Sequence, residues 1–281
     1  HEGEVGVGIY YFDVERNLIQ EKAFIPSKKS YAIAADELGK MVYYNHAEEQ
    51  LYVLADGTLY QVDLKKNKQT TLAENLKEGQ YAVSDDGHLM AYQSEGDKSG
   101  GTVIQVMNLS SLETNTVEAA SGEKISPLGF VNGDFIYGKM KSEDAGKKAS
   151  GESITPMYEL EIRNSKNKKV ASYSFVDKGI YISDILIDDN MVTLNRVEKS
   201  GDIYNVTSQE FITNNEERKD TAIKIEVYTT ALMEKQMRIT FAEGAGEKSV
   251  KVIRPNQLAS KNELEMVLAD NSESVKYYVY G

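Results

Sequence analysis

Short apolar strands preceded by a turn rich in Asp, Asn or Gly recur along the chain. This combination is typical of antiparallel sheet, because those turn residues tolerate left-handed backbone and strands bury alternate side chains. When Val42, Met90, Ile136 and Val192 are taken as equivalent, the spacings are 48, 46 and 56 residues. The turns and strands are 36–40 before 41–44, 85–88 before 89–92, 132–134 before 135–137, and 188–190 before 191–194.

A second pattern keeps nearly the same period. It is a strand of alternating polarity that ends in a polar residue and is followed by a turn, often containing Asn. From Asp13 through Asp63 and Asn108 to Arg163 the steps are 50, 45 and 55 residues. The copies are 9–14 with Asn17, 59–64 with Asn67, 104–109, and 158–163 with Asn167.

Two interleaved patterns with this period indicate one four-stranded propeller blade per repeat. Each small sheet has two apolar faces and must stack against neighbours to bury them. We therefore predict an all-β fold, a β-propeller-like array of about five four-stranded antiparallel blades, with a closed ring and an open arc both possible. No amphipathic stretch is long enough to favour a helical repeat, and residues 231–237 are expected to be the turn of a hairpin between 223–229 and 237–241.

The repeats divide the chain into predicted blades. Residues 1–244 form the array, with a partial blade at 1–28 and full blades at 29–76, 77–123, 124–179 and 180–244. Residues 6–24 are expected to be the outer strand pair of the partial blade, and its inner strands come either from 249–253 and 263–268 or from sequence beyond this chain. Residues 245–281 either close that blade or begin a further element.

Polar insertions and aromatic residues are interpreted structurally. Residues 141–153 and 214–220 are polar and are expected to be flexible surface loops, with a ligand-covering lid as the alternative reading. The tyrosines of the blade strands are expected to pack at the core or rim rather than form a binding patch. They are Tyr43, Tyr44, Tyr52, Tyr60, Tyr92, Tyr137 and Tyr158.

No catalytic, cofactor-binding or metal-binding residues are predicted. The turns at 84–87 and 188–190 lack the spacing of a calcium loop, and turn formation explains their Asp residues. His1, His46 and His88 are scattered, and the chain has no Cys to complete a zinc site. The fragment 98–101 lacks the strand-to-helix context of a serine nucleophile. Residues 108–110 and 205–207 match the glycosylation sequon, a match that is frequent by chance.

The net charge and the composition exclude some classes of binding partner. The formal net charge of −12 disfavours nucleic acid and anionic lipid. No apolar run is long enough to insert into a membrane. The first residues show neither an initiator Met nor a signal peptide, so we expect a segment of a larger exported protein. We expect a monomer with no cofactor.

Three stretches carry a resemblance to a known family: residues 1–10, the segments 127–130 and 135–138, and the end at 277–281. The chain resembles the propeller-like extracytoplasmic region of large lipoprotein-like surface proteins of clostridial Gram-positive bacteria. The resemblance covers essentially the whole chain and implies anchoring through sequence outside it. In some members it also implies a downstream domain similar to a papain-like C39 peptidase. It implies no site residue here.

These observations leave three functional hypotheses. The first is a non-enzymatic binding or scaffold module that presents the array to a protein, peptide or glycan. The second is a polysaccharide hydrolase or lyase whose carboxylates are assembled across blades. The third is a spacer that holds a distal domain away from the cell envelope and binds no ligand.

Overall fold

The computed structural model describes residues 5–97, 100–188 and 190–213, together with four later strands. The chain divides into two compact units, residues 1–214 with 255–281, and residues 215–254. In the smaller unit, β21 (Ile223–Thr229) and β22 (Lys235–Phe241) form an antiparallel hairpin. The hairpin predicted for this segment is therefore confirmed, and its second strand begins two residues earlier than expected.

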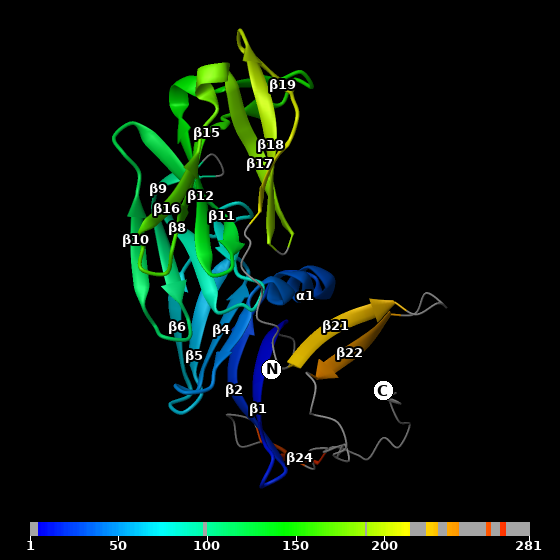
Figure 1. Ribbon diagram of the computed structural model, residues 1–281. Coiled ribbons are helices and arrows are strands. Elements are labelled where there is room, and N and C mark those ends of the chain that lie inside the picture. Colours follow the sequence, from blue (N-terminus) through cyan, green and yellow to red (C-terminus); the bar gives the residue numbers. More distant parts are fainter. Residues whose placement is uncertain are drawn as a thin grey trace. The chain divides into compact units, whose positions relative to one another are not determined.

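The larger unit is built of small sheets, which we number I to V (Figure 1). Sheet I contains β1 (Gly6–Asp13), β2 (Leu18–Pro26), β23 (Gln257–Ala259) and β24 (Glu265–Val267). Sheet II contains β3 (Val42–Asn45), β4 (Gln50–Ala55), β5 (Thr58–Asp63) and β6 (Lys68–Ala73). Sheet III contains β7 (Tyr81–Val83), β8 (Leu89–Asp97), β9 (Gly100–Asn108) and β10 (Thr114–Glu118).

Two further sheets complete the series. Sheet IV contains β11 (Glu123–Val131), β12 (Asp134–Lys141), β15 (Met157–Arg163) and β16 (Lys169–Tyr173). Sheet V contains β17 (Ile180–Asp188) and β18 (Met191–Ser200), whose two halves pair with β19 (Ile203–Val206) and β20 (Glu210–Thr213). Sheets III, IV and V lie on one hydrogen-bonded path, but only Ile125–Gly101 and Met157–Ile182 connect them. They are therefore separate antiparallel sheets.

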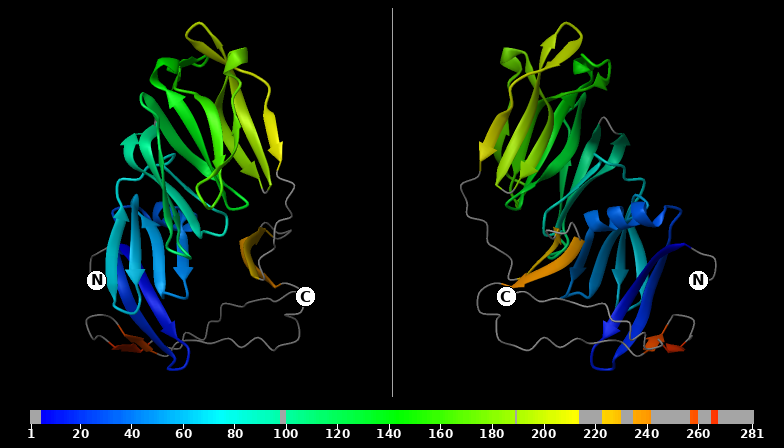
Figure 2. Two further views of the ribbon diagram at one scale, coloured as in Figure 1. Left: turned by 60° about the vertical axis from the view of Figure 1, so that its left-hand side comes forward. Right: turned by 90° about the vertical axis from the view of Figure 1, so that its right-hand side faces the viewer.

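Consecutive sheets pack face to face, and the alternation of side chains along each strand supplies both faces (Figure 2). In β8, Met90 and Tyr92 enter the core shared with sheet II, whereas Leu89 and Ala91 enter the core shared with sheet IV. Each fully buried aliphatic side chain contributes about 1.5–3 kcal/mol. This stacking of small, mainly antiparallel sheets makes the fold all-β and propeller-like, as the sequence predicts.

The second sequence pattern corresponds to a capped turn. Oδ1 of Asp63 accepts hydrogen bonds from the N–H groups of Lys65 and Lys66 at 3.0 and 2.8 Å, and Asn67 adopts φ 51°. Asp13 and Asn108 cap their turns in the same way. Such side-chain caps favour a turn over a continued strand. In the fourth copy the capping residue is Asn164, one position after Arg163, which the repeat aligns with Asp13.

In the first copy of the turn-and-strand pattern, the predicted turn at 36–40 is wrong, whereas the predicted strand at 41–44 corresponds to β3 (Val42–Asn45). Residues 36–40 belong to helix α1 (Tyr31–Lys40), which connects sheet I to sheet II. Four Ala and Leu residues give this segment high helix propensity, which outweighs its Asp and Gly. Glu37 of the helix accepts hydrogen bonds from the N–H groups of Asp56 and Gly57 at 2.8 and 2.7 Å, so α1 also holds the β4–β5 turn.

The insertion at 141–153, predicted to be a flexible loop, is folded. It contains the 3-10 turn η1 (Ser142–Asp144), β13 (Gly146–Lys148) and the start of β14 (Ser153–Ile154), and β13 pairs in parallel with β19. Asp144 is buried, its carbonyl accepts a hydrogen bond from Tyr204 Oη at 2.7 Å, and its carboxylate accepts one from Tyr181 Oη at 3.0 Å. A lid is not supported. The second predicted loop, 214–220, lies outside the described residues.

The C-terminal strands of sheet I differ from the expectation. β24 falls within the predicted segment 263–268, and the predicted segment 249–253 lies outside the described residues. β23 joins β2 in parallel, with Leu18 opposite Gln257, whereas an antiparallel blade requires antiparallel neighbours. The blade boundaries predicted from the sequence, at 1–28, 29–76, 77–123, 124–179 and 180–244, stay predictions.

The remaining helical elements are short. One more 3-10 turn, η2 (Val176–Lys178), leads into β17. Across the described residues, no helix has the length and apolar character needed to span a bilayer.

Candidate functional site

The two faces of sheet IV are chemically different. On one face, strands β12 and β15 place Phe135 opposite Arg163, Tyr137 opposite Glu161, and Lys139 opposite Glu159. The intervening pairs on the other face, such as Ile136 opposite Ile162, are apolar and enter the core shared with sheet V. Because directly opposed residues of an antiparallel pair share a face, the charged residues meet at the junction with sheet III.

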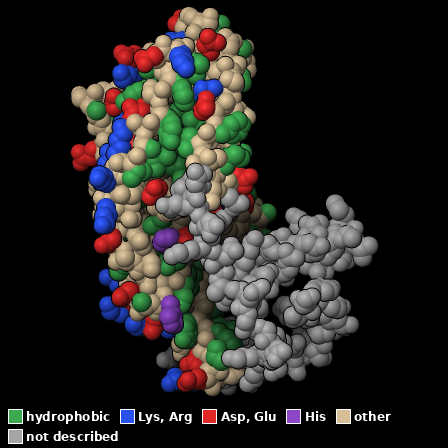
Figure 3. All heavy atoms as spheres, viewed as in Figure 1, with side chains coloured by type: hydrophobic (Ala, Val, Ile, Leu, Met, Phe, Trp, Pro, Cys, Tyr) green, Lys and Arg blue, Asp and Glu red, His purple; other side chains and the backbone are tan. Residues whose placement is uncertain are grey.

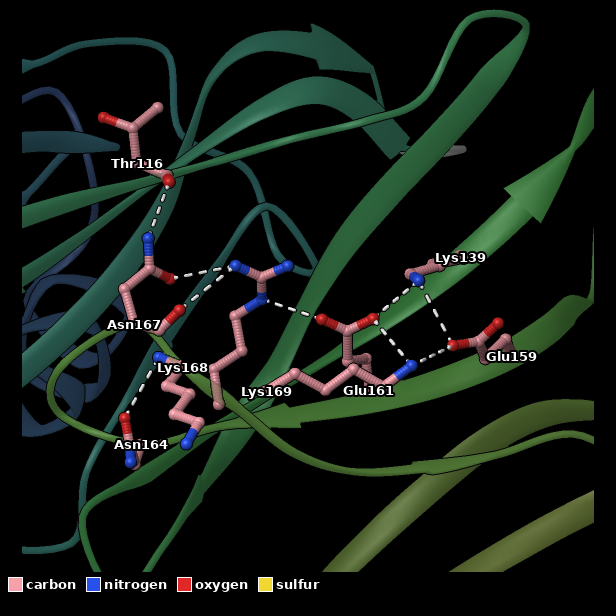
Figure 4. A network of polar contacts seen from close by, with 9 residues as sticks. Thr116, Lys139, Glu159, Glu161, Asn164, Asn167, Lys168 and Lys169 are labelled. Carbon is pink, nitrogen blue, oxygen red and sulfur yellow. Dashed lines mark hydrogen bonds and ion pairs between the residues drawn. The ribbon is translucent and has the colours of Figure 1, made fainter.

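Glu161 is the centre of this charged face, and its side chain is only 2% exposed. Its Oε2 lies 2.6 Å from Lys139 Nζ, and its Oε1 accepts a hydrogen bond from Arg163 Nε at 2.8 Å (Figure 4). Lys169 Nζ lies 3.6 Å from Glu161 Oε2 and 3.4 Å from Glu159 Oε1. Glu161 therefore bridges three cations, and each of them also contacts another acceptor, Glu159 for the two lysines and Asn167 for Arg163.

The network fixes the ionisation of its members. Burial opposes the charge on Glu161, but hydrogen bonds from Lys139 and Tyr137, with the charges of Lys139 and Arg163, outweigh burial and lower its pKa to about 2. Burial and the hydrogen bond to Glu161 raise the pKa of Tyr137 to about 12. Burial favours neutral Lys139, yet hydrogen bonds to Glu161 and Glu159 leave its pKa raised. At neutral pH these charged side chains keep fixed charges and are poorly suited to exchange protons.

The turn between β15 and β16 joins this network to sheet III. Asn167, at φ 58°, donates from Nδ2 to the carbonyl of Thr116 at 3.1 Å, and its own carbonyl accepts from Arg163 Nη1 at 3.2 Å. In return, Asn115 Nδ2 donates to the carbonyl of Ser165 at 3.2 Å. Reciprocal hydrogen bonds between sheets III and IV hold the turn in place.

A small recess of about 40 Å³ opens beside this turn. Its floor is apolar and its rim is polar, with amide, guanidinium and carboxylate groups. The β11–β12 turn, where Asn132 and Gly133 have φ 50° and 84°, closes one side, a conformation that favours an Asn-Gly pair. The lining residues are Leu89, Val106, Asn108, Glu113, Asn115, Phe130, Gly133, Phe135, Arg163, Asn164, Ser165 and Asn167.

Lys and Arg side chains gather near this site. On the face drawn in Figure 3 they line the edge of the molecule that carries β10 and β16 in Figure 1. Lys166 and Lys168, in the β15–β16 turn, are exposed, and neither forms an ion pair with any residue that the structure describes. The β15–β16 turn beside the recess therefore carries two lysines without an ion-pair partner among the described residues, while Glu113 lines the recess itself.

The residues singled out from the sequence lie elsewhere. In the turn at 84–87, Asp86 Oδ1 accepts from Ser84 Oγ at 2.7 Å and contacts His88 Nδ1, which is the turn role expected of it. His46 stacks edge-on against Tyr44. His1, Lys98, Ser99 and Asp189 lie outside the described residues. Within those residues, no group of three His, Cys, Asp or Glu side chains could hold a metal ion.

Most of the blade tyrosines take packing positions. Tyr52, Tyr92 and Tyr137 are buried in the cores between sheets. Tyr44 is 41% exposed. Tyr158 donates to Glu123 Oε1 at 2.6 Å, and burial with this hydrogen bond raises its pKa.

Sequence reasoning missed the Glu161 network. The strand 158–163 was recognised, and its charged residues at 159, 161 and 163 alternate with apolar ones, a pattern typical of a solvated face. A usable signal was the matching alternation of Tyr137 and Lys139 in the preceding strand. Pairing the two strands in register would have placed both sets on one face.

No protein-family model matches the chain, and no curated protein matches it. Among solved structures, it is similar to hydrazine synthase of Kuenenia stuttgartiensis at 11% identity, covering 77% of this chain and 60% of that one with a TM-score of 0.25. It is similar to the WD40 domain of SCAP from fission yeast at 10% identity, covering 62% and 44% with a TM-score of 0.27.

A putative TolB from Agrobacterium tumefaciens is similar at 9% identity, covering 70% of this chain and 79% of that one with a TM-score of 0.28. The chain thus spans less than two thirds of the first two structures. Similarities at these TM-scores carry no argument about function, and the fold assignment rests on the sheets themselves.

Proposed function

We propose that the chain is a non-enzymatic binding module of a larger, surface-anchored extracytoplasmic protein, built on about five propeller-type blades. Protein, peptide or glycan is the expected class of partner. The observation that carries the proposal is the recess with a polar rim at the junction of sheets III and IV, next to a network of ion pairs centred on Glu161. Binding modules commonly place polar groups on the rim of a rigid repeat scaffold.

The buried charges support binding rather than hydrolysis at this site. A glycosidase acid must hold a proton near neutral pH and therefore needs a raised pKa. The pKa of Glu161 is instead lowered to about 2, because its hydrogen bonds and paired cations outweigh burial. Glu159 and Glu161 also lie on one strand rather than on different sheets, as a site assembled across blades would require.

A thermal-shift screen tests the proposal. The chain has no Trp, so unfolding is followed by circular dichroism or a dye, in the presence of peptides, cell-wall fragments, glycans and Ca²⁺. A ligand at about 100 times its Kd adds roughly 2.7 kcal/mol of stability, or about 5–11 °C for a domain of this size. A rise of that size in the unfolding temperature, with the ligand recovered chemically unaltered, supports a binding module.

Two outcomes contradict the proposal. Release of products from a peptide or glycan, abolished by one carboxylate substitution, would identify an enzyme. A cooperative transition that no ligand class shifts would favour the spacer hypothesis.

A further inference from the structure

We propose that the recess beside Arg163 and Asn164 binds the carboxylate of an acidic side chain in a peptide segment. This inference rests on the proposed binding function and names the ligand class of that site. The argument uses the unused hydrogen-bond donors of the rim, the size of the recess and the charges around it.

Three rim side chains have donors that the described residues leave unused. Arg163 engages Glu161 through Nε, Asn167 through Nη1 and Tyr137 through a further side-chain hydrogen bond, which leaves part of its five N–H donors for the recess. Oδ1 of Asn108 accepts from the N–H groups of Ser110 and Ser111, and Oδ1 of Asn164 accepts from those of Lys166 and Lys168.

The side-chain NH2 groups of Asn108 and Asn164 are available to a ligand, because only the Oδ1 atoms cap the turns. Because the oxygen of each planar amide faces its own turn, the Nδ2 group is directed away from it and finds no acceptor among the described residues. The guanidinium of Arg163 and the two amide groups offer hydrogen-bond donors, and Glu113 supplies the carboxylate among the lining residues. These donors complement a ligand carboxylate, which only accepts hydrogen bonds when ionised.

The size of the recess limits the ligand. A volume of about 40 Å³ holds one functional group and not a sugar ring. The ligand therefore inserts the end of a side chain and leaves the rest of the molecule on the rim. An Asp or Glu side chain of a peptide meets this requirement.

The charges around the rim favour a peptide over a free anion. Lys166 and Lys168 are exposed and unpaired among the described residues, so they attract an acidic segment over short range. Glu113 lines the recess next to Asn108, whose N–H donates to the Glu113 carbonyl at 2.8 Å, and its Oε2 lies 3.4 Å from Ser111 Oγ. Its carboxylate repels a free anion but accepts a hydrogen bond from a backbone N–H, which a peptide supplies.

The donors are held in place before a ligand arrives. Glu161 fixes Arg163 at 2.8 Å, and the hydrogen bonds Asn167 to Thr116 and Asn115 to Ser165 fix the turn. Ordering the rim therefore costs little on binding. The buried network in Figure 4 thus positions Arg163 for the recess.

The test uses the full chain and two fluorescein-labelled peptides of the sequence Gly-Ser-Glu-Gly-Ser-Glu and its Gln counterpart. Fluorescence anisotropy is measured at low and physiological salt. We expect saturable binding of the Glu peptide that weakens with salt, and at least tenfold weaker binding of the Gln peptide. Equal binding of the two peptides, or stronger competition by inorganic phosphate than by unlabelled Glu peptide, would overturn the inference.

Two isosteric variants locate the site. Asn108→Asp and Asn164→Asp keep the oxygen that caps the turn, as Asp13 and Asp63 do in the equivalent turns, but exchange a donor for a negative charge. Each is expected to weaken binding of the Glu peptide at least tenfold with an unchanged circular-dichroism spectrum. Asn205→Asp adds the same charge at an exposed position of β19 and is expected to change binding less than twofold.

The outcomes separate this inference from the general proposal. If the Glu peptide binds but neither variant at position 108 or 164 weakens it, the site lies elsewhere and the inference fails. If the Glu peptide does not bind while another ligand class shifts the unfolding temperature, the inference fails and the binding module stands.

Discussion

The two faces of sheet IV both pack against a neighbouring sheet, but they do so with different kinds of side chain. The face toward sheet V is apolar, with Ile136, Leu160 and Ile162 in its core. The face toward sheet III combines aromatic side chains with Glu161, Lys139 and Arg163. Burial of apolar side chains stabilises a sheet junction without requiring a particular orientation of the contacts. A buried ion pair stabilises the junction only when both charged partners are in place. The junction of sheets III and IV therefore requires a particular pairing of charged side chains, which the apolar junction with sheet V does not.

The largest expected effect comes from removing the central charge. Glu161→Gln leaves Lys139 and Arg163 without their shared carboxylate, and we expect a loss of about 3–5 kcal/mol in the free energy of unfolding. Urea denaturation followed by circular dichroism measures it. Glu198→Gln makes the same chemical change at an exposed position and is expected to stay within about 0.5 kcal/mol. Equal effects of the two variants would remove the distinction between the faces.

The apolar face is expected to respond to lost volume rather than lost charge. Leu160 is 0% exposed, and Leu160→Ala should cost about 3 kcal/mol, within a range of roughly 2–5. Because no ionisable group is lost, this cost should be the same at pH 7 and pH 3. A cost that changes between these two pH values would show that the two faces are coupled.

The smallest effect is expected at the edge of the network. Lys169 is 48% exposed and lies 3.4 Å from Glu159. Exposed ion pairs contribute about 0–1 kcal/mol, so Lys169→Gln should lower the free energy of unfolding by no more than that. A loss comparable to that of Glu161→Gln would place Lys169, rather than Glu161, at the centre of the network.

Parts of this arrangement could be predicted from the sequence. Asp63 and Asn67 predict a turn from residue type alone, because the Asp63 carboxylate caps the turn and Asn67 tolerates positive φ. The uninterrupted apolar run from Leu89 to Tyr92 in β8 likewise predicts a strand buried on both faces. The helix at residues 31–40 was missed because Asp36 and Gly39 were weighed as turn residues against a strongly helix-forming segment.

The candidate site could not be predicted, because it depends on register. Lys139 and Glu159 are far apart in the sequence and meet only when β12 and β15 pair as they do. A one-residue slip would send one set to the opposite face. The fold of residues 141–153 depends in part on a distant partner, since β13 pairs with β19 as well as with its neighbour β14.

The pH dependence of one pair of proteins tests the account most directly. The pKa of Glu161 is lowered from its ordinary value of 4.5 to about 2, so its stabilisation is present above pH 4.5 and is lost as the pH falls toward 2. The difference in unfolding free energy between the unaltered chain and Glu161→Gln is measured by urea denaturation from pH 6 to pH 2.5. The account predicts that this difference shrinks by roughly 2–3 kcal/mol over that range. A difference that stays constant would contradict it, because Glu161 would then stabilise sheet IV by packing alone.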